Sequence, residues 1–417
     1  MNILLFYLTI FSAVLILESF LEVLNLRRAS SVKTVPVFFK NHISEDNFIK
    51  SAEYTLFKGK FKLISNLYEA AVLLYFIFSG LFGKIEVFLQ GLSLHPYITG
   101  IFFIYIVMFI LSAFMMPFGI YSEFVIEKKF GFSNMTVRLY IIDMLKGILL
   151  GVLLSFPLLL ALFWFMDKTG AFWWIYAFLF TAVFEIAINI LYPVLIAPLF
   201  NKFEKLDDTE LEKKLFSLAR RLKFAVNGIF KMDGSKRSRH SNAYFTGFGR
   251  MRRIVLFDTL LTSLDSDELE AVLAHEIGHN KKHHLIKGII LSLFILLAGF
   301  YIISLLAGFS PLFAEFGFEG PSYYGILVLV MLYSHPFTFL LTPFFNSLSR
   351  KHEYEADSFA VHAVGSRENM KNALLKLGRE NLSNLVPHKL YSFYHYSHPA
   401  LNERLSAIDN IVLDTVK

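Results

Sequence analysis

Residues 275–279 read His-Glu-Ile-Gly-His and have the types and spacing of a metal-dependent hydrolytic centre. On a helix, His275 and His279 are four residues apart and share a face, so both imidazoles can reach one ion. Two neutral imidazoles suit Zn²⁺. Glu276 lies beside them, placed to take a proton from a metal-bound water. The alternative is a solvated helix with two surface histidines; the pattern favours one Zn²⁺ per chain.

A catalytic zinc needs a third protein ligand, with one position left open. His283 continues the same face, but it is eight residues from His275, or about 12 Å along a helix axis. The better candidate is in Ser-Arg-Lys-His-Glu-Tyr-Glu-Ala-Asp-Ser-Phe-Ala at 349–360. There Glu353 can bind the metal, and Asp357, on the same face, can accept from the outer N–H of a ligand histidine. The alternative is a charged surface helix.

The local sequence supports a helix for the histidine pair. Asp265 is a good N-cap and Glu268 completes a capping box, while Leu264 and Leu269 can form a hydrophobic staple. We therefore expect this helix to begin just before residue 266. It should present both histidines to the second helix.

The composition of the whole chain indicates a membrane protein. Of 417 residues, 55% are hydrophobic and 18% charged, against about 25% charged in an ordinary soluble domain. The chain has no cysteine, which excludes thiolate metal sites, a cysteine nucleophile and disulfides. The low charge also excludes intrinsic disorder. Both metal helices must therefore belong to a polytopic membrane protein with water-facing parts.

Seven segments have the length and apolar character of a membrane span. They are 3–24, 63–83, 97–120, 147–166, 171–199, 285–308 and 322–345. The first lacks the positive start of a signal peptide, so we interpret it as a retained anchor. Residues 200–284 and 348–417 are water-facing by composition. We predict a five-span membrane domain over 1–200 and a metallopeptidase domain over 201–417 that includes spans six and seven.

The loop charges predict an orientation. Residues 25–62 carry eight Lys and Arg and residues 121–146 carry four, whereas the alternate loops carry almost none. The positive-inside rule then puts the N-terminus outside and the C-terminus in the cytoplasm. Both water-facing stretches lie on the cytoplasmic side, so the third ligand can meet the histidines there. The membrane would be the cell membrane in a prokaryote and the endoplasmic reticulum in a eukaryote.

Several motifs together resemble the type I CAAX prenyl protease family of integral-membrane zinc metalloendopeptidases. They are HEIGH at 275–279, SRKHEYEADSFA at 349–360, HSNAYFTGF at 240–248, YHYSHPALNERL at 394–405, YSEFVIEKKFGFSNMT at 121–136 and PLFNKFEKL at 198–206. Heat-shock-type membrane metalloproteases, a quality-control group, share the soluble motifs more loosely and are shorter. They are the alternative assignment.

The resemblance implies an all-α polytopic fold of seven transmembrane helices enclosing a water-filled chamber. A small, mostly helical zinc-peptidase domain with a short β-hairpin would lie on the cytoplasmic side. Family members remove a C-terminal tripeptide from prenylated CAAX proteins. The implied partners are therefore the bilayer and a peptide or protein substrate, lipidated or not. No nucleic acid is implied. The implied site roles are zinc binding by His275, His279 and Glu353, base catalysis by Glu276, and substrate or oxyanion contacts by Asn242, His398 and Arg404.

The residues themselves are compatible with these roles. Peptide hydrolysis builds negative charge on the scissile oxygen, which His398 and Arg404 could stabilise; the alternative is a salt bridge at a helix end. Residues 240–248 could form an edge strand that pairs with an extended substrate and uses Asn242 as an anchor; the alternative is an ordinary hairpin. Five ionisable residues within spans should face protein or water, since lipid exposure is costly: Glu18, Glu22, Glu69, Glu185 and His335.

Two other classes compete with a membrane peptidase. A channel or transporter with a structural metal site would need neither Glu276 nor an open metal position. A site-2-type intramembrane protease places its histidine motif inside a span. Here the motif helix is polar and continues as Asn-Lys-Lys-His-His. Both alternatives fit the residues less well.

Overall fold

The computed structural model describes residues 2–246 and 253–413. The last two residues of the predicted substrate strand, Gly247 and Phe248, lie outside this range. Within these residues, six helices are long and apolar enough to cross a membrane, or seven segments if one bent pair counts as a span. They include α1 (Ile3–Ser31), α2 (Glu45–Phe78), α4 (Pro96–Tyr121), α6 (Val137–Lys168), α7 (Trp173–Leu191), α12 (His284–Leu306) and the pair α14 (Tyr323–Tyr333) and α15 (His335–Val364).

The seventh predicted span is broken rather than straight. The sequence predicted one segment over 322–345, but α14 and α15 meet at Ser334 with a bend of 52°. Pro336 lies in the first turn of α15. Because proline has no N–H and its ring clashes with the carbonyl four residues earlier, the preceding helix ends before it. After the bend, α15 continues beyond the apolar region and carries the predicted third ligand.

The fifth predicted span is also irregular at its end. Helix α7 passes into a π-helix over Tyr192–Ile196 and then into α8 (Ala197–Phe200). Pro193 and Pro198 lie at the starts of these two short segments, where proline removes backbone donors. Shorter helices complete the membrane half: α3 (Leu81–Gln90), α5 (Lys128–Phe130) and α13 (Ser310–Glu315).

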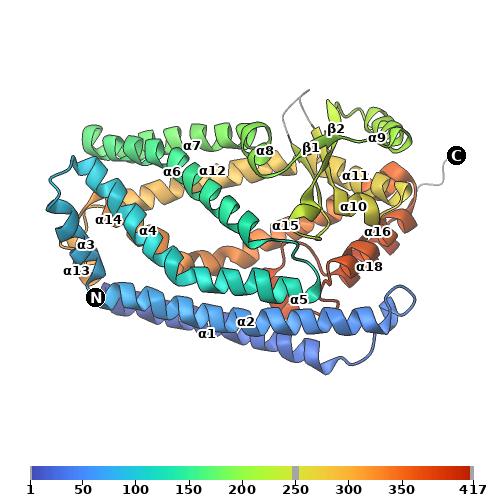
Figure 1. The fold of residues 1–417 in the computed structure, drawn as a ribbon, viewed down its shortest axis with the longest axis horizontal. Coiled ribbons are helices and arrows are strands. Elements are labelled where there is room, and N and C mark those ends of the chain that lie inside the picture. The colour runs from blue at the N-terminus through green and yellow to red at the C-terminus, as the bar shows by residue number, and fades with distance from the viewer. Residues whose placement is uncertain (1, 247–252, 414–417) are drawn as a thin grey trace.

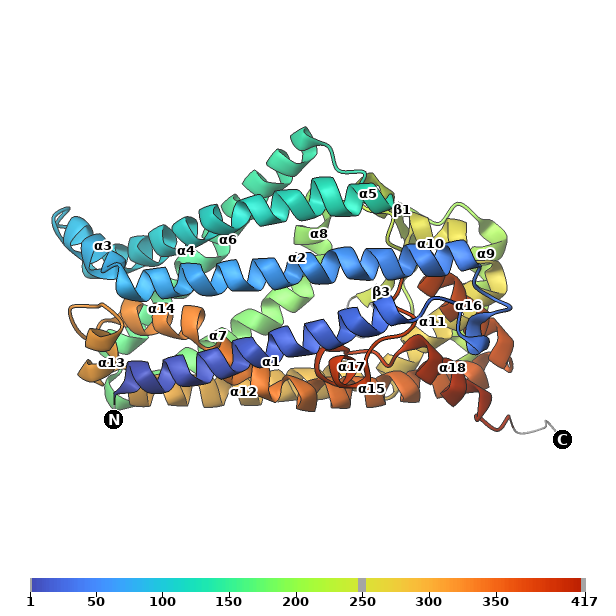
Figure 2. The same cartoon turned by 90° about the horizontal axis from the view of Figure 1, so that it is seen from below.

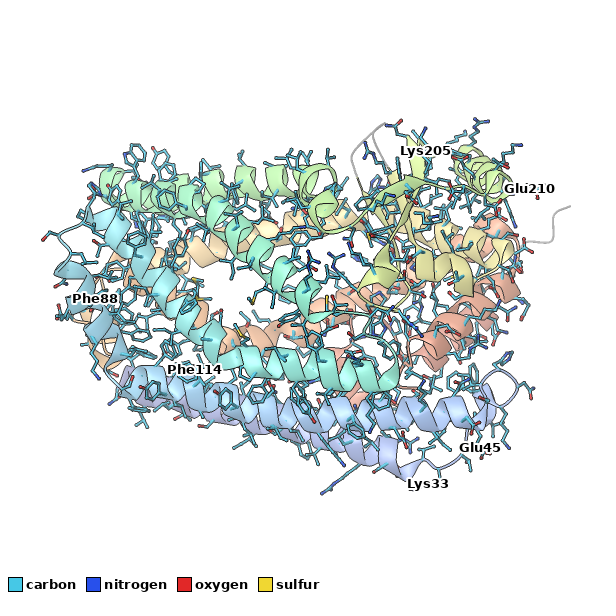
Figure 3. All side chains as sticks on the ribbon, viewed as in Figure 1. Lys33, Glu45, Phe88, Phe114, Lys205 and Glu210 are labelled. Carbon is cyan, nitrogen blue, oxygen red and sulfur yellow. The ribbon has the colours of Figure 1, made fainter. Side chains whose placement is uncertain are left out.

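The spans are arranged around a central region in the two views of Figures 1 and 2, and at one end α1, α2, α4, α6 and α14 share a buried core with α3 and α13. In the apolar stretch of the fifth span, 6% of the residues are buried inside the protein. In Figure 3, Phe88 and Phe114 lie in the half formed by the apolar spans. The charged residues labelled there lie at the opposite end: Lys33, Glu45, Lys205 and Glu210. The charged end is the one that carries the sheet and the C-terminal helices.

Most of the ionisable residues within the spans have protein partners. Nε2 of His335 is 3.0 Å from Glu18 Oε1, and Nζ of Lys62 is 3.2 Å from the Glu22 carboxylate. Ser292 donates to Glu185 at 2.9 Å. Each contact joins two different helices. These groups therefore have polar partners within the protein, which lowers the cost of placing charge in a span.

The other end contains a four-stranded sheet in the order β1-β2-β4-β3. Its strands are β1 (Phe203–Lys205), β2 (Gly228–Met232), β3 (Ala243–Thr246) and β4 (Arg253–Phe257). Strands β3 and β4 pair antiparallel, with Ala243 opposite Leu256, and form the predicted hairpin. The sheet extends further than predicted, because β2 pairs parallel to β4, with Phe230 opposite Val255. Strand β3 is left at the edge.

Helices cover this sheet and form one core with it. They are α9 (Thr209–Arg221), α10 (Asp258–Ser263), α11 (Ser266–Lys281), α16 (Arg367–Glu380) and α18 (Leu401–Asp409). Helix α17 (Lys389–His395) instead contacts α1 and α15. In α9, Leu211, Leu215 and Leu218 recur at helical spacing and are buried against the sheet and α11. The same core includes Phe39 from the segment between α1 and α2. The membrane half is therefore packed directly onto the peptidase half.

Candidate active site

Helix α11 carries the histidine pair, and its start is fixed by local hydrogen bonds. Oδ1 of Asp265 accepts from the backbone N–H of Asp267 and of Glu268 at 3.0 Å, and the Glu268 side chain accepts from Asp265 N at 2.9 Å. This is the predicted capping box. Leu264 and Leu269, the predicted staple, are both buried in the same core. The helix is thereby held in a fixed register.

A glycine within the motif allows α11 and α15 to approach closely. A Cβ added to Gly278 would lie 3.2 Å from both Cα and O of Ala356, closer than side chains normally pack. Ala356 is itself fully buried. Any larger residue at 278 would push the two helices apart. Because Glu353 and Asp357 lie on either side of Ala356, this contact brings them to the histidines.

The three predicted ligands lie together. Nε2 of His275 is 3.1 Å from Nε2 of His279. The Glu353 carboxylate oxygens lie 3.6 Å and 3.3 Å from these two nitrogens respectively. A tetrahedral Zn²⁺ with bonds of about 2.0–2.1 Å sets its ligand atoms roughly 3.3 Å apart. The spacing therefore fits such an ion, and a cation would relieve the repulsion between the facing lone pairs.

Asp357 lies behind His275. Its Oδ1 is 2.8 Å from Nδ1 of His275. Arg404, on α18, donates to the same carboxylate through Nε at 2.9 Å and Nη2 at 2.6 Å. A carboxylate on the outer nitrogen holds the imidazole in the tautomer that leaves Nε2 free for metal. Arg404 in turn fixes that carboxylate.

The outer nitrogen of His279 has a different partner, which the sequence analysis missed. Nδ1 of His279 lies 2.9 Å from Nδ1 of His284, and Nε2 of His284 lies 3.0 Å from Glu355 Oε2. The available signal was His284, five residues after His279.

His398 and Arg404 both reach Glu353, in unlike surroundings. Nε2 of His398 lies 3.4 Å from Glu353 Oε1, and Nη1 of Arg404 lies 3.5 Å from Oε2. The His398 side chain is 62% exposed and that of Arg404 only 12%. A cavity of about 420 Å³, lined by both and by Asn381, opens beside them. His398 can therefore meet a substrate directly, while Arg404 is held by carboxylates.

Glu276 and Asn242 lie on neighbouring elements. Glu276 is partly buried on α11, and burial raises the pKa of its carboxyl, which suits a group that must both take and return a proton. Asn242 is exposed directly before β3, where its side chain accepts from Ala243 N at 2.8 Å and its carbonyl accepts from Phe257 N at 3.1 Å. Strand β3 contacts α11. The anchoring role of Asn242 stays a prediction.

Two family models match consecutive parts of the chain, and full-length relatives are known. Residues 25–202 match the family described as CAAX prenyl protease N-terminal, five membrane helices, and residues 205–412 match peptidase family M48. CAAX prenyl protease 1 of Saccharomyces cerevisiae is 38% identical, covering 94% of this chain and 92% of its own. The CAAX prenyl protease 1 homolog of Arabidopsis thaliana is 37% identical, covering 96% and 97%.

A solved structure shares the whole fold. The crystal structure of S. mikatae Ste24p superposes with a TM-score of 0.90 at 36% identity, over 97% of this chain and 99% of that one. The fold, the apolar spans and the relatives agree on a multi-pass membrane metallopeptidase that acts on peptides or proteins. A heat-shock-type assignment is not favoured. The chain belongs to peptidase family M48, in the group of the CAAX prenyl proteases.

Proposed function

We propose that this chain is a zinc metalloendopeptidase that removes the C-terminal tripeptide from prenylated CAAX proteins. The observation that carries the proposal is the cluster of His275, His279 and Glu353 at tetrahedral spacing. The printed names of the full-length relatives support the substrate class. The donor set of two imidazoles and one carboxylate is typical of catalytic zinc.

Each residue has a role in this proposal. His275, His279 and Glu353 hold one Zn²⁺, which polarises the scissile carbonyl and lowers the pKa of water when bound. Glu276 takes a proton from the attacking water and returns it to the leaving amine. His398 donates to the developing oxyanion, together with Arg404. Asn242 and the free edge of β3 hold the extended peptide, and Asp357 keeps His275 oriented.

Cleavage of matched peptides tests the substrate class. The full-length protein in liposomes should be offered one CAAX peptide with and without a farnesyl thioether, with the Glu276→Gln variant as the blank. We expect tripeptide release from the farnesylated peptide at a much higher rate. Equal rates would reject prenyl recognition, and no cleavage of either by zinc-loaded protein would reject the CAAX endopeptidase proposal.

We also propose the orientation and the division of the chain. The loop charges support an outer N-terminus and a cytoplasmic site, with a membrane domain over 1–200 and a peptidase domain over 201–417 that includes spans six and seven. The membrane would be the cell membrane or the endoplasmic reticulum, according to the source. Tags at the C-terminus and near Lys236 should both be labelled only from the cytoplasmic side. Labelling from opposite sides would overturn this topology.

A further inference from the structure

A chain of side-chain contacts runs from the metal cluster to the edge of α15. It begins at His279 on α11, passes through His284 at the start of α12 and ends at Glu355 on α15, with both nitrogen contacts near 3 Å. The His284 ring is 6% exposed and stacks on His352, with centroids 4.0 Å apart and an interplanar angle of 13°. Three elements therefore meet at one buried imidazole.

The backbone is shaped to make this contact. On a continuous helix, residues five apart point about 140° away from each other, so His284 could not face His279. Helix α11 ends at Lys281, and His283 adopts a left-handed conformation with φ of 58° before α12 begins. This break redirects the chain so that His284 folds back toward the motif.

The direction of the hydrogen bonds follows from the ligand role of His279. Its Nε2 faces the other ligands and must carry a lone pair to bind a cation, so its proton is on Nδ1. That proton is donated to Nδ1 of His284, which must therefore be an acceptor. The proton of His284 is then on Nε2 and is donated to Glu355. Every donor and acceptor in the chain is satisfied by neutral imidazoles and one carboxylate.

We propose that His284 and Glu355 are positioning residues that hold His279 in its metal-binding tautomer and ring orientation. They would do for His279 what Asp357 does for His275. The inference rests on the proposed zinc site. Outer partners of this kind typically contribute 10–100-fold to metal affinity, so their loss should appear first in metal retention.

Chelator competition on the purified full-length protein measures this effect. Zinc release from His284→Ala should be about 10–100-fold easier than from wild type. Glu355→Ala should show a smaller change in the same direction, whereas Glu355→Gln, which keeps an acceptor oxygen, should retain most of the affinity. Loading with Co²⁺ supplies a spectroscopic signature: the visible absorption bands should change in His284→Ala.

A neighbouring histidine gives the matched control. His283→Asn alters an exposed residue beside His284, and asparagine tolerates the left-handed backbone; its zinc affinity should equal that of wild type. Unchanged zinc affinity and Co²⁺ spectrum in His284→Ala would overturn the inference, as would equal losses in His283→Asn. If His284→Ala does not fold, Glu355→Ala decides, since Glu355 is partly exposed. Wild-type protein that binds no zinc would instead reject the proposed function.

Discussion

Helices α11 and α7 are buried to very different extents. Nine of the sixteen residues of α11 are buried, including His275, whereas three of the nineteen residues of α7 are buried. The first contacts β3, α9, α15 and α16, whereas the second contacts mainly α6 and α12. The helix that positions the chemistry thus has a protein core behind it. The span depends on the bilayer and on the central region for most of its surroundings.

This contrast indicates which parts of the molecule need accurately positioned side chains. Metal ligands must be held to within a fraction of an ångström, which a close-packed core provides. Spans that are exposed over most of their surface have no such requirement. We therefore expect substitutions to matter most at the site, then in the core behind it, and least among the polar pairs between spans. The following predictions test that order.

The largest effect is expected from Glu276→Gln. The amide keeps the size of the side chain but cannot act as a base, so turnover should fall by about 10²–10⁴-fold. Zinc content should stay at the wild-type level, because Glu276 is not among the three ligands. Metal analysis and peptide cleavage on the same sample measure both quantities. Near-normal turnover would mean that the histidine motif is not the catalytic centre.

The next effect concerns the core behind α11. Leu215 is fully buried, so Leu215→Ala should lower the free energy of unfolding by about 2–5 kcal/mol. The matched control is Phe294→Ala on α12, where the side chain is 67% exposed and the loss should be within about 0.5 kcal/mol. Thermal unfolding in the same detergent compares them. Similar losses in both would contradict the proposed contrast between the two halves.

A third pair of substitutions, at His398 and Arg404, separates stabilisation of the oxyanion from the positioning of Asp357. His398→Ala should lower kcat by about 10²–10³-fold and leave KM and zinc affinity nearly unchanged, since an oxyanion donor acts in the transition state. Arg404→Ala should lower kcat similarly and also weaken zinc retention, because it releases Asp357. A rise in KM with kcat unchanged for His398→Ala would mean that His398 binds the substrate and does not stabilise the transition state selectively.

The smallest effect is expected within the spans. Glu18 contacts His335, whose side chain is more than half exposed, and such pairs contribute about 0–1 kcal/mol. Glu18→Gln should therefore shift thermal unfolding only slightly and leave zinc content unchanged. Thermal unfolding and metal analysis, measured on the same preparation, check both expectations. A loss as large as that of Leu215→Ala would show that span polar pairs are structural supports.

Local patterns made the centre of the site predictable. The spacing of His275 and His279, the Asp265 cap and the acidic pair on the second helix are all set by residues within one or two turns. The pairing of β2 with β4 was missed because the two strands are distant in the sequence. Their five residues each do not indicate which strand they pair with or in which register. The bend at Ser334 was not predicted, although Pro336 was the available signal, and its angle depends on packing. Gly278 and His284 were missed because their importance lies in contacts with α15, which spacing along one helix does not reveal.

The separation of the metal ligands along the chain has a consequence for biosynthesis. During translation, α11 is made before α12, α14 and α15, so Glu353 is added to the chain only after the apolar segments of the last two spans. The donor set is therefore incomplete until both segments have been made. Metal loading would then be a late step, and a bound ion would join the ends of both spans in one closed loop. A nascent or misinserted chain would remain without proteolytic activity, which protects the membrane from a premature hydrolase.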